Sequence, residues 1–202
     1  PTMSVMQPAE RRRLQSRADA RRAILDATEA LLVEDGYEAF SMRRLADRCG
    51  YTAPTIYHHF GDKQHLIDAL LDERCQGLVR TLRRVHQSED LVENLRAFSG
   101  AFVRFGLRNP THYALLSQPR DPGLPVPPAA EEARVLMEAP LHQLAAAGRL
   151  VADEETVGQS LWAFLHGFIL LRTTRTDLEW SKDGLDVGID ALLRGFLREE
   201  IS

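Results

Sequence analysis

The chain has 202 residues, with 25 lysines and arginines against 29 aspartates and glutamates, and a formal net charge of −4. Its 44% hydrophobic and 27% charged residues are typical of a soluble globular protein of one or two domains. No apolar run approaches the roughly 18–20 residues that a membrane span needs, and no secretory signal follows the first arginines. We therefore expect no membrane partner. Cys49 and Cys75 form neither a disulfide framework nor a C-x-x-C metal pair, so we expect the protein to lie in a reducing cytoplasm.

The positive charge gathers near the N-terminus. Residues 11–22 carry six arginines and one acidic residue, Asp19, which gives a local charge of +5. Such arms commonly bind nucleic-acid backbones, and a solvated disordered tail is the alternative. Because little apolar content precedes Arg17, we predict that residues 1–17 form a mobile basic arm.

The first ordered segment after this arm is predicted to hold three helices. From Ala18 the apolar residues recur at three- and four-residue spacing, and Gly36 ends the run. Two short helical patterns follow, each preceded by an N-cap residue, Ser41 or Thr52. Gly50 between them suits the left-handed residue that ends a helix. Two short helices joined by a glycine-containing turn are typical of a helix-turn-helix, whose second helix lies in the DNA major groove.

The remainder of the chain is also predicted to be helical, because no segment alternates apolar and polar residues as a strand does. Asp62 caps a long helix, Pro140 indicates a kink or break, and five prolines predict an irregular connection at residues 118–128. Helices are expected at residues 63–85, 88–108, 110–116, 129–148, 153–174 and 181–200. The fold class is therefore all-α with about nine helices, divided into the arm, a helix-turn-helix domain at residues 18–64 and a second domain at residues 65–202.

The last two helices carry apolar stripes that could join two copies of the chain. A single recognition helix reads only a few base pairs, so specific binding normally needs a symmetric pair. We expect a homodimer through a four-helix interface, and Gly188 and Gly195 would allow close helix approach. The alternative is that the stripes only close the core of the monomer. The stripe residues are Val157, Leu161, Leu165, Phe168, Ile169, Leu185, Ile189, Leu192, Leu193, Phe196 and Leu197.

Several of these residues together resemble the TetR family of transcriptional regulators over about residues 18–70. The resemblance rests on Ala27, Leu31, Gly36, Ser41, Leu45-Ala46, Gly50, the segment TAPTIYHHF, Asp62-Lys63 and Leu66. A looser likeness to one subgroup of ligand domains rests on Arg108-Asn109-Pro110, Tyr113, Trp162 and His166-Gly167.

The resemblance implies a dimeric repressor that binds a palindromic operator in double-stranded DNA and is released by a small-molecule effector. It implies no enzyme and no cofactor, and no nucleophile–base set or phosphate loop points to one. A transcriptional activator of the same fold and a helical interaction protein without DNA binding are the alternatives.

The expected DNA contacts lie at the start of the second short helix and beside it. Ala53 and Pro54 offer no hydrogen bond to a base edge, so sequence selection is expected to depend on Arg43, Thr55 and His58, with a guanine as the partner of Arg43. A phosphate contact or a solvated arginine is the alternative. Tyr57 and Lys63 resemble phosphate contacts. The expected DNA-binding residues are Ser41, Arg43, Thr52, Ala53, Pro54, Thr55, Tyr57, His58 and Lys63.

Two further groups of side chains are of a type that can form binding sites. His58, His59 and His65 lack an acidic or cysteine partner at metal-ligand spacing, so no metal site is predicted. The second domain also carries a set of aromatic residues with polar tips, and the TetR resemblance implies that they line an effector pocket between its helices; an ordinary helical core is the alternative. These residues are Phe98, Phe102, Tyr113, Trp162 and His166.

Overall fold

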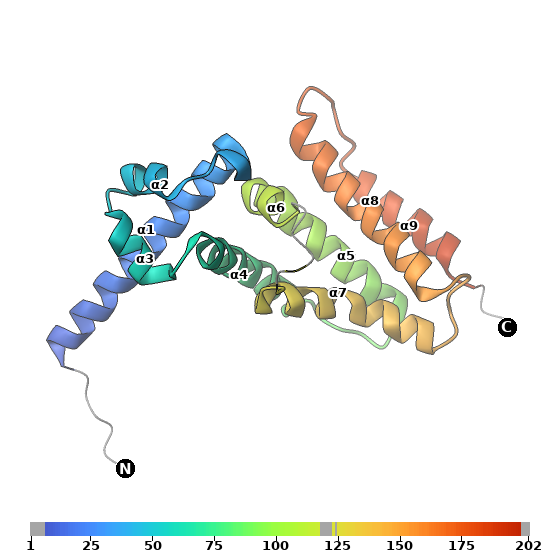
Figure 1. The fold of residues 1–202 in the computed structure, drawn as a ribbon. Helices are drawn as coiled ribbons and strands as arrows, with labels where there is room; N and C mark the ends of the chain where they lie inside the picture. Colours follow the sequence, from blue (N-terminus) through green and yellow to red (C-terminus); the bar gives the residue numbers. More distant parts are fainter. Residues whose placement is uncertain (1–6, 118–122, 124, 199–202) are drawn as a thin grey trace, which may run out of the picture. The chain divides into compact units, whose positions relative to one another are not determined.

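The computed structural model describes residues 7–117, 123 and 125–198. This part of the chain contains nine α-helices and no strand, which confirms the all-α prediction (Figure 1). The helices are α1 (Pro8–Ala39), α2 (Met42–Cys49), α3 (Ala53–Phe60), α4 (Lys63–Leu82), α5 (Leu91–Arg108), α6 (Pro110–Leu116), α7 (Pro128–Ala146), α8 (Glu154–Thr174) and α9 (Gly184–Phe196). The chain forms two compact units, Pro1–Leu71 and Asp72–Ser202, which divide within α4. No helix in the described part is long and apolar enough to cross a membrane.

Helix α1 begins at Pro8, ten residues before the predicted start at Ala18. Residues 8–17, which the sequence analysis assigned to a mobile arm, are therefore helical, and residues 1–6 lie outside the described part. Pro8 suits a first helical turn, and the arginine, glutamate, glutamine and alanine residues that follow favour a helix without any apolar face. All of residues 8–19 are exposed, so apolar periodicity could not reveal this extension.

The first unit is built around α1, which packs on α2, and α2 in turn packs on α3. Gly36 interrupts α1 with a positive φ of 77°, a conformation that favours glycine, at the predicted helix end. Each helix contributes fully buried apolar side chains, among them Ile24, Leu45 and Ile56. Replacing such a residue with alanine typically costs about 2–5 kcal/mol, so these contacts fix the orientation of α2 and α3.

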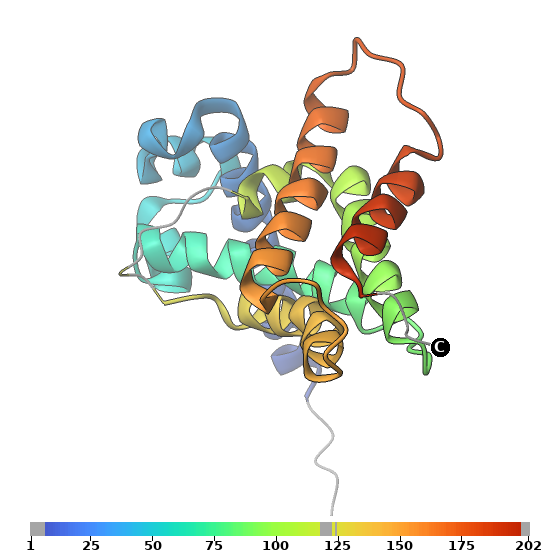
Figure 2. The same ribbon diagram turned by 90° about the vertical axis from the view of Figure 1, so that its right-hand side faces the viewer.

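The second unit is organised around α5, which packs against α6, α7, α8 and α9 (Figure 1 and Figure 2). One apolar cluster joins α5 to α8 and α9, and includes Val103, Leu165 and Ile189. A second joins α5 to α7 and the latter half of α4, and includes Leu82 and Phe98. The cavity described below lies among these helices.

Several predicted helix boundaries are corrected. Helix α5 begins after Asp90 instead of at Ser88, because the Asp90 carboxylate accepts hydrogen bonds from the Val92 and Glu93 amides at 2.8 and 3.2 Å. Helix α4 ends at Leu82 instead of Val85. Helix α7 continues through Pro140, so this proline does not break the helix.

The last helix is shorter than the predicted range 181–200. Helix α9 ends at Phe196, and an isolated antiparallel bridge pairs Leu197 with Leu150. The Val151 amide donates to the Phe196 carbonyl at 2.9 Å, and the Arg198 amide donates to the Arg149 carbonyl at 2.8 Å. These bonds hold the end of α9 against the α7–α8 connection. Most of the predicted irregular stretch at residues 118–128 lies outside the described residues.

The apolar stripes expected at a dimer interface are largely used within the monomer. Six of their residues are buried in the core shared by α5, α8 and α9: Val157, Leu161, Leu165, Ile169, Ile189 and Leu193. At Gly188 an added Cβ would collide with the ring of Phe164 on α8, so this glycine permits close approach of two helices of the same chain. The apolar side chains that remain exposed on α8 and α9 do not belong to the predicted stripes. They include Leu170, Leu171 and Val187, which are 54%, 48% and 62% exposed.

Candidate functional site

Helices α2 and α3 have the capping geometry that their sequence predicts. The Ser41 hydroxyl accepts a hydrogen bond from the Arg44 amide at 3.3 Å, and the Thr52 hydroxyl accepts one from the Thr55 amide at 3.4 Å. Gly50 ends α2 with a φ of 72°. These local hydrogen bonds fix where α3 begins, and therefore which of its residues form the exposed N-terminal tip.

The three arginines of α2 differ in their partners. Arg44 pairs with Asp35 at 2.8 Å, and Arg48 forms two hydrogen bonds to Glu34, at 2.5 and 2.6 Å. The bond from Arg48 lowers the pKa of the Glu34 carboxyl. Arg43 is exposed and forms no ion pair with any residue in the described part of the chain. The acidic residues of α1 thus leave one arginine of α2 free to bind an external acceptor.

The predicted contact residues of α3 lie on its outer side and its tip. Thr52 and Pro54 are exposed, and Tyr57 is 47% exposed, whereas Ile56 and Phe60 face the core. The Thr52 and Thr55 hydroxyl oxygens lie 2.9 Å apart and share a hydrogen bond. His58 is exposed next to Tyr57, while Ala53 is half-buried.

Lys63 begins α4, as predicted, but its ammonium lies against the end of α1. It donates to the Phe40 carbonyl at 3.2 Å and to the Tyr37 carbonyl at 3.4 Å, and lies 4.4 Å from the centre of the Tyr37 ring. An ammonium group has three N–H donors, so two are used here and one is left for another acceptor. Lys63 therefore holds α4 to the segment that precedes α2.

The histidines near α3 have separate environments. His59 is half-buried, and burial together with the nearby Arg17 lowers its pKa. His65 lies 2.9 Å from the Asp62 carboxylate, which also accepts a hydrogen bond from the His65 amide. No group of three or more histidine, cysteine or acidic side chains in the described residues could hold a metal ion.

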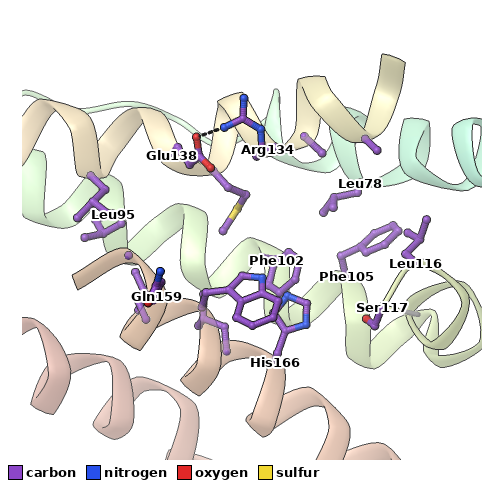
Figure 3. A pocket seen from close by; sticks show the side chains of 18 of the residues that line it. Leu78, Leu95, Phe102, Phe105, Leu116, Ser117, Arg134, Glu138, Gln159 and His166 are labelled. Atoms are coloured by element: carbon purple, nitrogen blue, oxygen red, sulfur yellow. Dashed lines mark hydrogen bonds and ion pairs between the residues drawn. The ribbon is translucent and has the colours of Figure 1, made fainter. Parts of the chain in front are cut away.

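The second unit contains a cavity of about 680 Å³ bounded by residues of α4, α5, α6, α7 and α8. Four of the five predicted effector residues line it: Phe102, Tyr113, Trp162 and His166. Figure 3 shows the Phe102 and His166 rings close together, with Phe105, Leu116 and Ser117 further along the cavity. Phe98 is the exception, because it is buried in the α4–α5–α7 cluster and does not line the cavity.

An aromatic and polar group lies at one side of this cavity. The Tyr113 hydroxyl is 2.8 Å from His166 Nδ1, and the Trp162 and His166 ring centres are 4.5 Å apart. Burial lowers the pKa of His166 and raises that of Tyr113, so both side chains are uncharged at neutral pH. The cavity therefore presents hydrogen-bonding groups from Tyr113 and His166 without a positive charge.

Comparison with known proteins agrees with this two-part arrangement. The family model for bacterial regulatory proteins of the tetR family matches residues 24–70, and a tetracyclin repressor-like C-terminal domain model matches residues 95–196, just over half of the chain. The chain belongs to the TetR family.

Curated relatives in this family include an activator and a repressor. The transcriptional activator FasR from Mycolicibacterium smegmatis is 33% identical over 101 residues, 50% of this chain and 46% of FasR. The repressor AcnR from Corynebacterium efficiens is 32% identical over 99 residues, 49% of this chain and 46% of AcnR. The match thus spans about half the length of each curated relative. A TetR family regulator from Marinobacter aquaeolei has the same fold, with a TM-score of 0.72, 17% identity, and coverage of 92% of this chain and 100% of that one.

The structure adds cavity residues that the sequence analysis of this TetR family chain missed. Arg134, Met137 and Glu138 come from α7, and Glu155 and Gln159 come from α8. Residues 130, 133, 134, 137, 138 and 141 recur at three- and four-residue spacing, so they form one face of α7. That periodicity was visible in the sequence, but nothing in it indicated that this face borders a cavity.

Proposed function

We propose that the protein is a transcriptional regulator that binds a palindromic operator as a homodimer, represses transcription and is released by a small-molecule effector. Residues 18–64 would form the DNA-binding domain, and residues 65–202 the effector-binding and dimerisation domain. The observation that carries the proposal is the capped α2–α3 pair, with exposed Arg43 beside the exposed tip of α3. In such a pair the second helix lies in the DNA major groove while the first crosses the DNA backbone.

The contacts to DNA would be divided between base reading and phosphate binding. Arg43 would read a guanine through its O6 and N7 acceptors, because a guanidinium can donate two parallel hydrogen bonds to them. Thr52 and Thr55 would be positioned at base edges, Ala53 and Pro54 would make close apolar contacts, and Ser41 would contribute near the backbone. Tyr57, His58 and Lys63 would bind phosphates, with Lys63 using its remaining N–H donor.

Dimerisation is supported by the apolar side chains left exposed on α8 and α9. These side chains are Leu170, Leu171 and Val187, which are all about half exposed or more. Leaving this apolar area in contact with water costs free energy, which burial at an interface would recover. A twofold pairing of these helices would cover them. Two recognition helices would then meet half-sites about one helical turn apart.

The effector would act by shifting the population of conformations. Cys75 and Leu78 line the cavity and belong to α4, the same helix that begins with Lys63. A molecule that prefers one arrangement of α4 would favour a dimer whose recognition helices are wrongly spaced for the operator. Linkage then requires that operator binding lower the affinity for the effector by the same factor by which the effector lowers the affinity for the operator.

Selection of random duplexes on the purified protein, followed by fluorescence anisotropy, tests DNA binding without any effector. We expect an inverted repeat to be enriched, and its affinity to fall steeply as salt rises because phosphate contacts release counterions. Sequence-independent binding, or no binding, would sink the proposal.

Activation of transcription is the second candidate function, since the similar protein FasR is named an activator. A reporter gene behind the selected operator distinguishes the two. Repression predicts higher expression when the gene for this protein is deleted, whereas activation predicts lower expression.

A further inference from the structure

The rim of the effector cavity carries an excess of negative charge. Among the described lining residues, the carboxylates are those of Glu138, Glu154 and Glu155, and Arg134 is the one side chain that is always cationic. Three negative groups against one positive group give a net charge of −2. Figure 3 shows the Arg134–Glu138 pair at the edge of the cavity.

The positive charge of Arg134 is already matched within the protein. Its guanidinium binds Glu138 and forms two hydrogen bonds to Glu131, at 2.6 and 2.9 Å. Glu154 forms an ion pair with His142 of α7. Glu155, by contrast, accepts a hydrogen bond at 3.0 Å from the uncharged amide of Gln159. An incoming anion would therefore find no unmatched cation among the described lining residues, whereas an incoming cation would find the Glu155 carboxylate, whose hydrogen-bond partner is uncharged.

The interior of the cavity offers an anion no compensation either. Its walls are mainly apolar, with Leu78, Leu95 and Phe105 among them, and His166 is kept neutral by burial. Moving a carboxylate or phosphate from water into such surroundings without a paired cation is strongly unfavourable. An apolar chain or ring, in contrast, gains free energy from the same walls.

Trp162 supplies a further feature suited to a cation. It lines the cavity yet is 63% exposed, and Gln159 and Glu155 lie one and two turns before it on α8. The face of an indole ring attracts cations, especially where carboxylates lie nearby. The cationic group of a bound molecule would lie at this rim, with its apolar part in the cavity.

Resting on the effector-controlled function proposed above, we propose that the effector is a largely apolar molecule carrying one positive charge. The 680 Å³ cavity holds its apolar part, and the acidic rim beside Trp162 binds its cationic end. Fatty acids, acyl phosphates and other apolar anions are thereby disfavoured.

Three probes with the same ten-carbon chain test the charge preference: decyltrimethylammonium, decanol and decanoate. The full chain carrying Trp180→Phe leaves Trp162 as its one tryptophan, so quenching of its fluorescence reports binding at the rim. We expect decyltrimethylammonium to bind most tightly, decanol next and decanoate most weakly. Each exposed carboxylate should change the affinity of a charged probe by about threefold.

A charge-neutral variant of Glu155 tests whether the acidic rim causes this order of affinities. Glu155→Gln should weaken decyltrimethylammonium binding by about threefold, strengthen decanoate binding and leave decanol binding unchanged. Glu89→Gln removes a carboxylate that is exposed like that of Glu155 but does not line the cavity, and should change none of the three affinities. Thermal unfolding verifies that the variants remain folded.

The outcomes separate this inference from the proposed function. Tightest binding by decanoate, equal binding of all three probes, or no quenching by any of them overturns the charge assignment. The proposed regulatory function is tested separately, by measuring operator binding in the absence of any probe.

Discussion

Arg43→Ala gives the sharpest test of how DNA is read. Because Arg43 is exposed and has no ion-pair partner among the described residues, its loss should change the free energy of unfolding by less than about 0.5 kcal/mol. A bidentate contact to guanine contributes about 1–3 kcal/mol of discrimination. The variant should therefore lose roughly 5- to 150-fold selectivity at one base position in each half-site while keeping its melting temperature.

Competition anisotropy against a panel of operators, each with one symmetric base substitution, measures this selectivity. The unaltered protein should penalise substitutions at one guanine that Arg43→Ala tolerates, and the other positions should keep their penalties. Arg48→Ala is the control, because it removes an arginine of the same helix that is bound to Glu34. Equal weakening on every operator would show that Arg43 binds phosphate and would refute its assignment as the base reader.

Three further predictions follow from contacts in both units. Lys63→Ala should weaken binding to all operators alike. It should also lower the melting temperature, because the Tyr37 and Phe40 carbonyls lose their hydrogen-bond donor. Weaker binding with an unchanged melting temperature would contradict the role of Lys63 in anchoring α4. Leu171→Asp should convert the proposed dimer into a monomer in analytical ultracentrifugation, whereas Leu178→Asp, at a similarly exposed loop position, should not. Burial lowers the pKa of His166 in the folded state, so the unfolded chain takes up more protons and stability should fall as pH drops below about 6.5. His166→Gln should reduce that loss in urea titrations at several pH values, and an unchanged pH dependence would show that His166 is not its source.

The local features of the helix-turn-helix could be predicted from sequence because each depends on neighbours in the chain. Ser41, Gly50 and Thr52 act through hydrogen bonds or backbone angles within four residues, so the residue type and spacing are sufficient. The partners of Lys63 lie 23 and 26 residues before it, and no spacing rule predicts that its ammonium binds their carbonyls.

The pocket was only partly predictable for a related reason. Phe98 and Phe102 lie four residues apart on α5, so their directions differ by about 40°. That rotation is enough to bury Phe98 in one cluster while Phe102 reaches the cavity. The acidic rim was missed because it combines α7 with α8, and the contact between two helices is not encoded in the periodicity of either one.

The backbone bridge at the end of α9 has a consequence for how this chain can diverge. Because Val151, Phe196 and Arg198 are joined through main-chain amides and carbonyls, the register of α9 is held largely irrespective of which side chains follow it. Substitutions on the outward faces of α8 and α9 can then accumulate without releasing the last helix. These outward faces form the proposed dimer surface, which would let the chain pair with its own copy and not with a related regulator. That surface can therefore change in sequence at little cost to folding.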